Sequence, residues 1–262
     1  MKALYIFAGA NGAGKTSLYT SYKEHFDSLP FVNADELLKE VTGNNDPSNA
    51  KFGQDLAKAK MEECFDEGKS FVFETVFSHE SKIDLVLRAK ELGYMVAIYF
   101  CHVGDSALNV ARVKKRTELG GHDVPEDKIL KRIPRTLENV RRAFSLVDSF
   151  FVFDNSSAVG HRLVAYKEIA SSIIINSNAP AWAKNLTRID KSPASKSKQA
   201  VSPLMPNRGL GQTRSKERIL YKACVRCGRF LRGKVRPHHG VCSICEPKLN
   251  SSAYRKAAIA SI

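Results

Sequence analysis

Apolar positions along the first two thirds of the chain follow two different periods. Short runs of consecutive apolar residues, typical of buried strands, alternate with longer stretches whose apolar residues lie three and four positions apart, as in helices. The expected strands span residues 3–8, 31–33, 70–73, 94–100 and 150–153. The expected helices span residues 14–26, 50–67, 80–92 and 106–119, and another helical stretch begins at Pro125.

Strands that alternate with helices predict βαβ units and therefore an α/β fold, a parallel sheet with helices on both faces. Proline lacks the amide hydrogen that a helix interior requires, so Pro134 should kink or divide the last helical stretch. The segment 162–175 should add a helix or an edge strand. Gly9, Asp35, Glu74 and Asn155 each follow an expected strand closely, which places them along one rim of the sheet, where ligands of such folds bind.

Charge divides the chain into two parts. The net charge is +14, yet residues 1–175 hold 23 of the 41 basic residues and 24 of the 27 acidic ones. The remaining 18 basic and three acidic residues fall in the C-terminal third. We therefore expect a nearly neutral folded domain over residues 1–175, and any contact with polyanions in the tail.

Composition changes again after residue 175. Residues 176–213 hold four prolines among many Ser, Lys and Asn residues, and we interpret them as a flexible basic linker. Residues 214–262 form the expected C-terminal module. No apolar run approaches the roughly 18 to 20 residues that span a membrane, so we expect a cytoplasmic protein without membrane contact.

Four of the six cysteines lie in the C-terminal module. Cys224 and Cys227 form one C-x-x-C pair, and Cys242 and Cys245 form a second pair after fourteen residues. Two such pairs offer four thiolates to one tetrahedral Zn²⁺, which predicts a small zinc-ribbon-like module folded by its metal. Two redox dithiols or an iron–sulfur cluster are the alternatives. Cys64 and Cys101 are isolated and should act as small buried hydrophobic side chains.

Basic residues surround the cysteine pairs. Arg226, Arg229, Arg232, Lys234 and Arg236 lie there, with an aromatic side chain, Phe230, between them. This pattern suits contact with RNA or DNA, and docking to a protein is the second interpretation.

A phosphate-binding loop follows the first expected strand. The pattern G-x-x-x-x-G-K-[ST] is matched throughout by Gly9, Ala10, Asn11, Gly12, Ala13, Gly14, Lys15 and Thr16, and Ser17 continues into the helix. Its glycines let successive backbone amides surround phosphate oxygens, Lys15 reaches the β- and γ-phosphates, and the Thr16 hydroxyl binds Mg²⁺. Because no guanine-reading N-K-x-D motif is present, we expect ATP as the nucleotide, and a P-loop kinase-type sheet.

Two further strand ends carry candidate catalytic groups. Asp35 should face the γ-phosphate and deprotonate an acceptor hydroxyl, although it could also cap a helix that begins at Glu36. Glu74 should hold a Mg²⁺-bound water or a substrate hydroxyl, with a purely structural carboxylate as the alternative, and Thr75 follows it.

Arginines mark an expected lid. Arg112 and Arg116 share one helix face, and Arg132 and Arg135 follow a glycine-rich turn that contains His122. Closure of such a lid would bring guanidinium groups onto the transferring phosphoryl group. A solvated basic face is the alternative for these four, and it is the preferred interpretation for Lys114, Lys115, Arg141 and Arg142.

Several segments together resemble the zeta toxin family of P-loop kinases. The segments AGANGAGKTS, NADE, FETVFS, LGYMVAIYF, RVKKRTELGGHDVPEDKILKRIPRTLEN and FDNS occur in that order between residues 3 and 157. The resemblance implies phosphorylation of a sugar hydroxyl of UDP-N-acetylglucosamine by Mg²⁺ and ATP, and an antitoxin partner. It also implies a phosphate-binding Lys15, a base at Asp35, Glu74 and Thr75 on the substrate side, and clamping by Arg116 with Arg132 or Arg135.

Three functions remain open from the sequence. The first is a small-molecule kinase of zeta toxin type with a regulatory zinc tail. The second is a kinase that acts on nucleic acid presented by the basic tail, and the third is an ATP-gated binding module without catalysis.

Overall fold

The computed structural model describes residues 1–44, 46–121, 123–169, 171–187, 222–223 and 230–231. The chain divides into two compact units, Met1–Thr187 and Arg188–Ile262. Cys224, Cys227, Cys242 and Cys245 lie outside the described residues, so the zinc site stays a prediction. In the second unit, the described residues form one antiparallel pair, β8 (Lys222–Ala223) and β9 (Phe230–Leu231).

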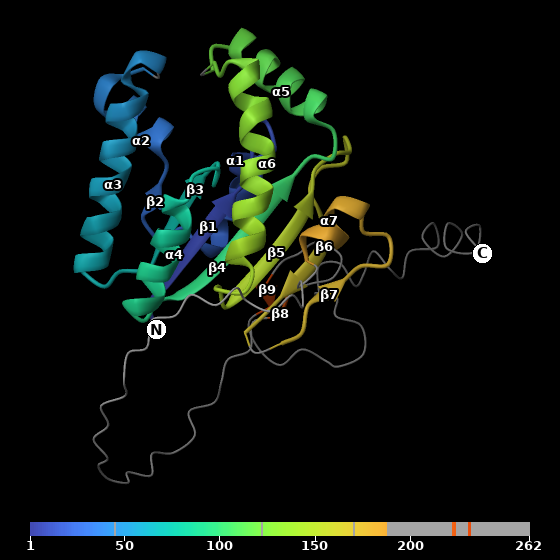
Figure 1. Ribbon diagram of the computed structural model, residues 1–262. Helices are drawn as coiled ribbons and strands as arrows, with labels where there is room; N and C mark the ends of the chain where they lie inside the picture. Colours follow the sequence, from blue (N-terminus) through green and yellow to red (C-terminus); the bar gives the residue numbers. More distant parts are fainter. Residues whose placement is uncertain (45, 122, 170, 188–221, 224–229, 232–262) are drawn as a thin grey trace, which may run out of the picture. The chain divides into compact units, whose positions relative to one another are not determined.

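The first unit is built on a seven-stranded sheet in the order β2-β3-β1-β4-β5-β6-β7 (Figure 1). The strands are β1 (Ala3–Ala8), β2 (Phe31–Val32), β3 (Phe71–Thr75), β4 (Met95–His102), β5 (Ser149–Asp154), β6 (Arg162–Lys167) and β7 (Ile174–Ile175). The first five are parallel, as the sequence predicts, whereas β6 pairs antiparallel with β5 and β7 pairs antiparallel with β6. The segment 162–175 therefore forms edge strands.

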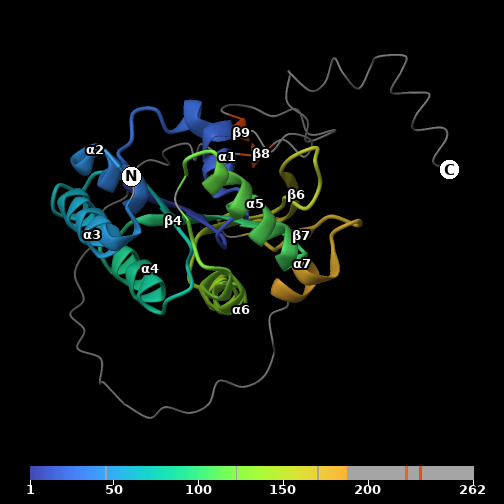
Figure 2. The same ribbon diagram turned by 90° about the horizontal axis from the view of Figure 1, so that it is seen from above.

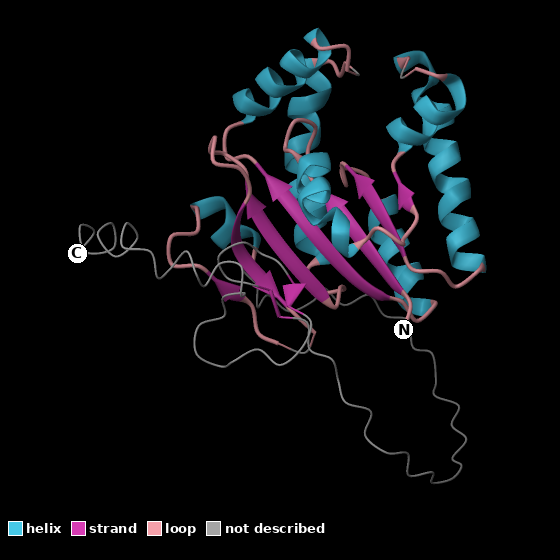
Figure 3. Ribbon diagram, turned by 180° about the vertical axis from the view of Figure 1, so that it is seen from behind, coloured by secondary structure: helices cyan, strands magenta, loops and turns pink. Residues whose placement is uncertain are grey.

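Helices lie on both faces of the sheet, which Figure 2 shows from above and Figure 3 from behind. They are α1 (Lys15–Tyr22), α2 (Ala34–Thr42), α3 (Ala50–Asp66), α4 (Ser81–Glu91), α5 (Ser106–Glu118), α6 (Glu126–Ala143) and α7 (Ala181–Leu186), with short 3₁₀ turns η1 (Lys23–His25) and η2 (Pro47–Asn49). In Figure 2, α1 lies on the opposite side of the strands from α4 and α6. In Figure 1, α5 and α2 rise on either side beyond the carboxyl ends of the strands.

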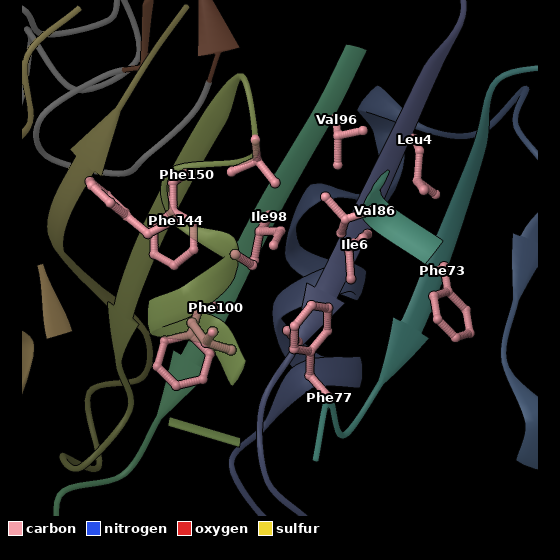
Figure 4. Packing of buried hydrophobic residues seen from close by; sticks show 14 of the residues in the cluster. Leu4, Ile6, Phe73, Phe77, Val86, Val96, Ile98, Phe100, Phe144 and Phe150 are labelled. Atoms are coloured by element: carbon pink, nitrogen blue, oxygen red, sulfur yellow. The ribbon is translucent and has the colours of Figure 1, made fainter. Parts of the chain in front are cut away.

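The larger core packs one sheet face against α3, α4, α6 and α7. Ile6, Ile98 and Phe100 extend from the central strands toward Val86 of α4 and the side chains of α6 (Figure 4). The opposite face is aromatic, because Phe7 stacks on Tyr99 at 4.7 Å and meets Tyr19 of α1 edge-on. Burial of these apolar faces, at about 25 cal/mol per Å², supplies the main stabilisation of the sheet.

Two expectations about the helices need correction. Of the two outcomes expected at Pro134, a kink or a division, the division does not occur, because α6 continues through Pro134 from Glu126 to Ala143. The expected linker from residue 176 begins too early, because α7 lies within it. Ala183 and Leu186 of α7 are buried in the main core, and the Trp182 ring meets His102 at 4.6 Å, so this short apolar helix belongs to the first unit.

No helix among the described residues is both long enough and apolar enough to span a bilayer.

His102 provides a test of the packing between β4 and α7. Its imidazole is buried against Phe100 and Trp182, and burial lowers its pKa from 6.5 to about 4, an effect that Asp154 opposes. The unfolded chain binds a proton below about pH 6.5, whereas the folded chain resists protonation until about pH 4. The free energy of unfolding should therefore fall by roughly 2 to 3 kcal/mol as the pH drops through this window, and stay level above it.

Urea unfolding of wild type and His102→Phe between pH 7 and pH 4 measures this contribution. The phenylalanine keeps the ring contacts and removes the titrating group, so the pH slope of the variant should be smaller. Equal slopes in the two proteins would show that His102 is not the group responsible.

Candidate active site

The loop between β1 and α1 packs tightly against its neighbours at three glycines. A Cβ atom at Gly9 would lie 2.3 Å from the Cys101 carbonyl oxygen, and one at Gly12 would lie 2.3 Å from the Asn109 carbonyl oxygen. At Gly14 it would lie 2.3 Å from Nδ2 of Asn155. Gly12 and Gly14 also have φ of 74° and 94°, in the region that favours glycine. The loop therefore requires glycine for both space and backbone conformation.

Side chains from three segments hold the carbonyl groups of this loop. Nδ2 of Asn109, from α5, donates to the Asn11 carbonyl at 2.8 Å. Nδ2 of Asn155 and Sγ of Cys101 each donate to the Ala13 carbonyl at 2.9 Å. A hydrogen-bonded carbonyl fixes its peptide plane, so these contacts preset the orientation of the loop.

His161 contributes a fourth anchor. Its Nε2 lies 2.9 Å from the Gly14 carbonyl oxygen, and because a carbonyl only accepts, Nε2 must carry the proton. Burial lowers the pKa of His161, which keeps this neutral tautomer. The first amides of α1 have no partner within the helix, so the preset loop offers them to an anion.

Cys101 differs from the expected role of a simple hydrophobic side chain. It is fully buried, and burial raises the pKa of its thiol to about 12, so it remains a neutral hydrogen-bond donor under the loop. Cys64 is buried in the main core, as expected.

Lys15 and Thr16 begin α1 directly after the loop. Nζ of Lys15 donates to the Ala10 carbonyl at 3.2 Å. Burial lowers the pKa of Lys15, while the nearby carboxylates of Glu74 and Asp35 act in the opposite direction. The ammonium is thus held at the loop, close to the carboxylates of Glu74 in β3 and Asp35 in α2.

Glu74 has one oxygen bound and one without a partner. Oε1 accepts from the Thr16 hydroxyl at 3.0 Å, whereas Oε2 is buried and has no hydrogen-bond partner among the described residues. A hydroxyl beside a carboxylate oxygen that lacks a partner is an oxygen set of the type that Mg²⁺ prefers. Thr16 and Glu74 therefore fit the expected metal.

Asp35 is not a helix cap. α2 begins at Ala34, and its cap is Asn33, whose side chain accepts from the amides of Asp35 at 2.8 Å and Glu36 at 3.3 Å. The Asp35 carboxylate lies one position inside the first turn and is exposed to the cavity. The capping interpretation is therefore wrong, because the preceding asparagine already satisfies these amides.

The lid consists of α5, α6 and the turn between them. Val113, Val124 and Ile129 form a small core of their own within it. One guanidinium nitrogen of Arg132 donates to Oδ1 of Asn11 at 3.2 Å, which connects the lid to the phosphate loop. Lys114 and Lys115 are exposed, and Arg141 and Arg142 pair with Glu138 and Glu80, as a solvated face predicts. His122 lies outside the described residues.

Arg112 brings a partly buried guanidinium group to the lid. Its Nη1 is buried and has no hydrogen-bond partner among the described residues. It lies close enough to Cys101 and His161 to act on their pKa values, whereas Arg116 acts on Lys15. The two arginines, one helical turn apart, thus lie close to different groups of the site.

The phosphate loop, the two carboxylates and the lid arginines open into one cavity of about 1550 Å³. The predicted site residues that line it are Asn11, Gly12, Gly14, Lys15, Thr16, Ser17, Asp35, Glu74, Thr75, Arg116, Arg132 and Arg135. Gly9, Ala10 and Ala13 lie in the loop itself. The volume exceeds the roughly 300 to 1,000 Å³ of a typical single-ligand site, so the cavity has room for two substrates.

Sequence reasoning did not identify three of the residues that hold the loop. Asn109, His161 and Cys101 belong to no motif, and their contacts depend on how α5 and the β5–β6 connection pack. Asn155 was placed on the correct rim by the strand that precedes it, but its bond to the Ala13 carbonyl was not foreseen.

The site combines a phosphate loop at the end of β1, carboxylates from β3 and α2, and an arginine lid across the same cavity. This combination defines a P-loop kinase, which is an ATP-dependent phosphotransferase. The family model of the zeta toxin matches residues 1–162, so the chain belongs to the zeta toxin family. Its first unit is therefore a zeta toxin-like kinase domain.

Individual relatives are distant. An uncharacterized protein of Haemophilus influenzae is 26% identical over 135 residues, which cover 50% of this chain and 91% of that protein. The structure of AvrRxo1-ORF1:-ORF2 with ATP is similar in fold, with a TM-score of 0.56, 19% identity and coverage of 75% of this chain. The same complex with sulphate ions gives a TM-score of 0.55 at 19% identity. The match spans 66% of the AvrRxo1 chain.

The tight fit at Gly12 leads to a direct test of the loop. In Gly12→Ala, the new methyl group would collide with the Asn109 backbone, and φ would be strained. We expect loss of Mg·ATP binding by at least about a hundredfold, measured by calorimetry. Gly93→Ala is the matched control, because Gly93 has φ of 77° but no atom within 4 Å of the added Cβ. Equal affinities in the two variants would contradict the proposed packing.

Proposed function

We propose that the protein transfers the γ-phosphoryl group of ATP to a hydroxyl of a small-molecule acceptor, such as the sugar of UDP-N-acetylglucosamine. The observation that carries the proposal is the single cavity that holds the phosphate loop, Asp35, Glu74 and the lid arginines together. In the reaction, the bond between the γ-phosphorus and its bridging oxygen breaks and ADP leaves. The acceptor oxygen forms the new bond to phosphorus, and its proton passes to Asp35.

The donor nucleotide occupies the loop end of the cavity. The amides at the start of α1 and the Lys15 ammonium bind the β- and γ-phosphates. The hydrogen bonds to the Asn11, Ala13 and Gly14 carbonyls keep those amides in position before ATP arrives, which reduces the reorganisation needed on binding. Bound at Thr16 and Glu74, Mg²⁺ would neutralise charge on these phosphates.

Asp35 acts as the base and Thr75 lies beside the acceptor. Asp35 lines the same cavity as Lys15 and acts on its pKa, which supports a position of the Asp35 carboxylate within reach of the terminal phosphate. The exposed side chain leaves room for an acceptor hydroxyl between carboxylate and phosphorus. The presence of a carboxylate at this position favours a kinase over an ATP-gated binding module, because a module without catalysis does not require a base.

The lid arginines divide their roles along the nucleotide. Arg116, Arg132 and Arg135 clamp the transferring phosphoryl group, where negative charge accumulates in the transition state. To reach the phosphoryl group, Arg132 would give up its hydrogen bond to Oδ1 of Asn11. We assign Arg112 to the nucleoside side of the triphosphate, since its Nη1 is buried without a hydrogen-bond partner among the described residues and Arg112 lies close enough to His161 to lower the pKa of that residue.

A protein partner and the basic tail extend this proposal. The AvrRxo1-ORF1:-ORF2 structure is a complex of two proteins, and we propose an antitoxin-like partner for this chain as well. The tail, whose cysteines we propose to bind Zn²⁺, would serve recruitment or regulation. The charge of the tail also favours a second candidate, a kinase that acts on RNA or DNA ends.

Asp35→Asn tests the base. The amide preserves the shape of the side chain but accepts no proton, so kcat should fall by about 10²- to 10⁴-fold while the affinity for Mg·ATP changes little. Transfer of labelled phosphate to UDP-N-acetylglucosamine gives the rate. Glu40→Gln, on the same helix but outside the cavity, should retain the wild-type rate. A fully active Asp35→Asn protein would exclude Asp35 as the base.

Arg112→Met tests the division among the arginines. If Arg112 contacts ATP and ADP equally, its loss should weaken the binding of both nucleotides by about tenfold or more and leave kcat nearly unchanged. Arg116→Met should instead reduce kcat. Lys114→Met, exposed on the same helix, is the control. If Arg112→Met lowers only kcat, its assignment to the nucleoside side is incorrect.

Truncation after Thr187 separates the two acceptor classes. Residues 1–187 form a compact unit with their own core, so the truncated chain should remain folded. A small-molecule kinase should keep most of its turnover, whereas a nucleic-acid kinase should lose its affinity for oligonucleotides and the salt dependence of that affinity.

A further inference from the structure

The connection between β3 and α4 forms one wall of the cavity. Val76, Phe77 and Ser78 line the cavity directly after Thr75, the last residue of β3. Because the donor triphosphate occupies the loop end of the cavity, this wall borders the space left for the acceptor. The conformation of the backbone in this wall therefore decides which main-chain groups the acceptor meets.

The backbone of this wall is strained. Phe77 is the one non-glycine residue with positive φ, 65°, among the described residues, and its side chain is fully buried in the main core. A bulky residue keeps such a conformation only where its surroundings enforce it. The buried ring fixes the side chain, but it does not fix the planes of the two peptide groups on either side of it. Those peptide groups need restraints of their own.

Two side chains of α6 supply these restraints. The Thr136 hydroxyl donates to the Val76 carbonyl at 3.0 Å, and Nδ2 of Asn139 donates to the Phe77 carbonyl at 3.2 Å. Thr136 and Asn139 are buried, so both hydrogen bonds are shielded from water. The two donors lie three positions apart and therefore share one face of the helix. In this way α6 holds two consecutive carbonyl groups of the strained connection.

The hydrogen bonds to α6 also set the direction of two backbone amides. In a trans peptide the carbonyl and the N–H point in opposite directions, so the amides of Phe77 and Ser78 point away from α6. Neither amide donates a hydrogen bond within the part of the chain that the structure describes. Because both residues line the cavity, their amides are available to a molecule that occupies it.

The same helix carries two of the lid arginines. Arg132 and Arg135 precede Thr136 in α6, and both line the cavity. One continuous helix therefore bears the guanidinium groups proposed to clamp the phosphoryl group and the donors that hold the acceptor wall. Phosphoryl transfer requires the acceptor oxygen to be aligned with the phosphorus atom, and attachment of both walls to one helix favours this alignment.

We propose that Thr136 and Asn139 are positioning residues for the transfer reaction. By holding the Val76 and Phe77 carbonyls, they present the amides of Phe77 and Ser78 to an oxygen atom of the acceptor. Neither Thr136 nor Asn139 lines the cavity itself, so each acts through the connection that it holds. The inference rests on the proposed function.

Variants of similar shape test this in the full-length chain. Thr136→Val and Asn139→Leu each remove a donor, whereas Thr136→Ser keeps the hydroxyl. Tyr94→Phe is the matched control, because the buried Tyr94 hydroxyl donates to the Cys64 and Lys69 carbonyls away from the cavity. Transfer of labelled phosphate to UDP-N-acetylglucosamine gives kcat and the KM of the acceptor. Calorimetry gives the affinity for Mg·AMP-PNP, and urea unfolding gives the stability of each protein.

We expect Thr136→Val and Asn139→Leu to raise the KM of the acceptor at least about tenfold, while kcat and the affinity for Mg·AMP-PNP stay within about threefold of wild type. Thr136→Ser should restore the wild-type KM. Tyr94→Phe should lose stability but keep the wild-type KM, because its hydrogen bonds support the core alone.

Two results would show that Thr136 and Asn139 have only a structural role. One is a KM that changes no more than in Tyr94→Phe, and the other is an equal loss of affinity for Mg·AMP-PNP. A wild-type protein that transfers no phosphate to UDP-N-acetylglucosamine would instead overturn the proposed acceptor, and this inference with it.

Discussion

The site depends on one set of hydrogen bonds, in which side chains outside the phosphate loop donate to the carbonyl groups of the loop. Asn109, Cys101, Asn155 and His161 come from α5, β4 and the connection after β5, yet all four donate to carbonyl oxygens between Asn11 and Gly14. Each bond contributes only about 1 kcal/mol, but together they fix a glycine-rich segment that would otherwise have many conformations. The amides that remain at the start of α1 are then aligned for a triphosphate.

The strand order makes these hydrogen bonds possible. β1 lies between β3 and β4, and β4 in turn pairs with β5, so the ends of all four strands meet beside the loop. β3 supplies Glu74 next to Thr16, while β4 and β5 supply the groups beneath the loop. The lid completes the arrangement through Asn109 and Arg132, both of which contact Asn11. Movement of the lid and occupancy of the loop are therefore physically linked.

The sequence predicts the parts of this arrangement that depend on local pattern. Apolar runs place the five parallel strands, and the loop motif places Lys15 and Thr16, because both signals lie within a few consecutive residues. It does not predict contacts between distant segments, such as His161 with Gly14, since no short motif encodes them. The cap of α2 was missed because Asn33 and Asp35 are both good capping residues, and only the backbone shows which one begins the helix. α7 was missed because six residues between polar segments carry too little periodic signal.

Amide hydrogen exchange across residues 9–16, with and without Mg·AMP-PNP, tests the central claim most directly. If the loop is held by its carbonyls and offers its amides to a triphosphate, these amides should exchange readily in the free protein and become strongly protected when the nucleotide binds. The segment 101–109 beneath the loop should be protected in both states. Unchanged exchange at residues 9–16 in the presence of saturating Mg·AMP-PNP would contradict the account.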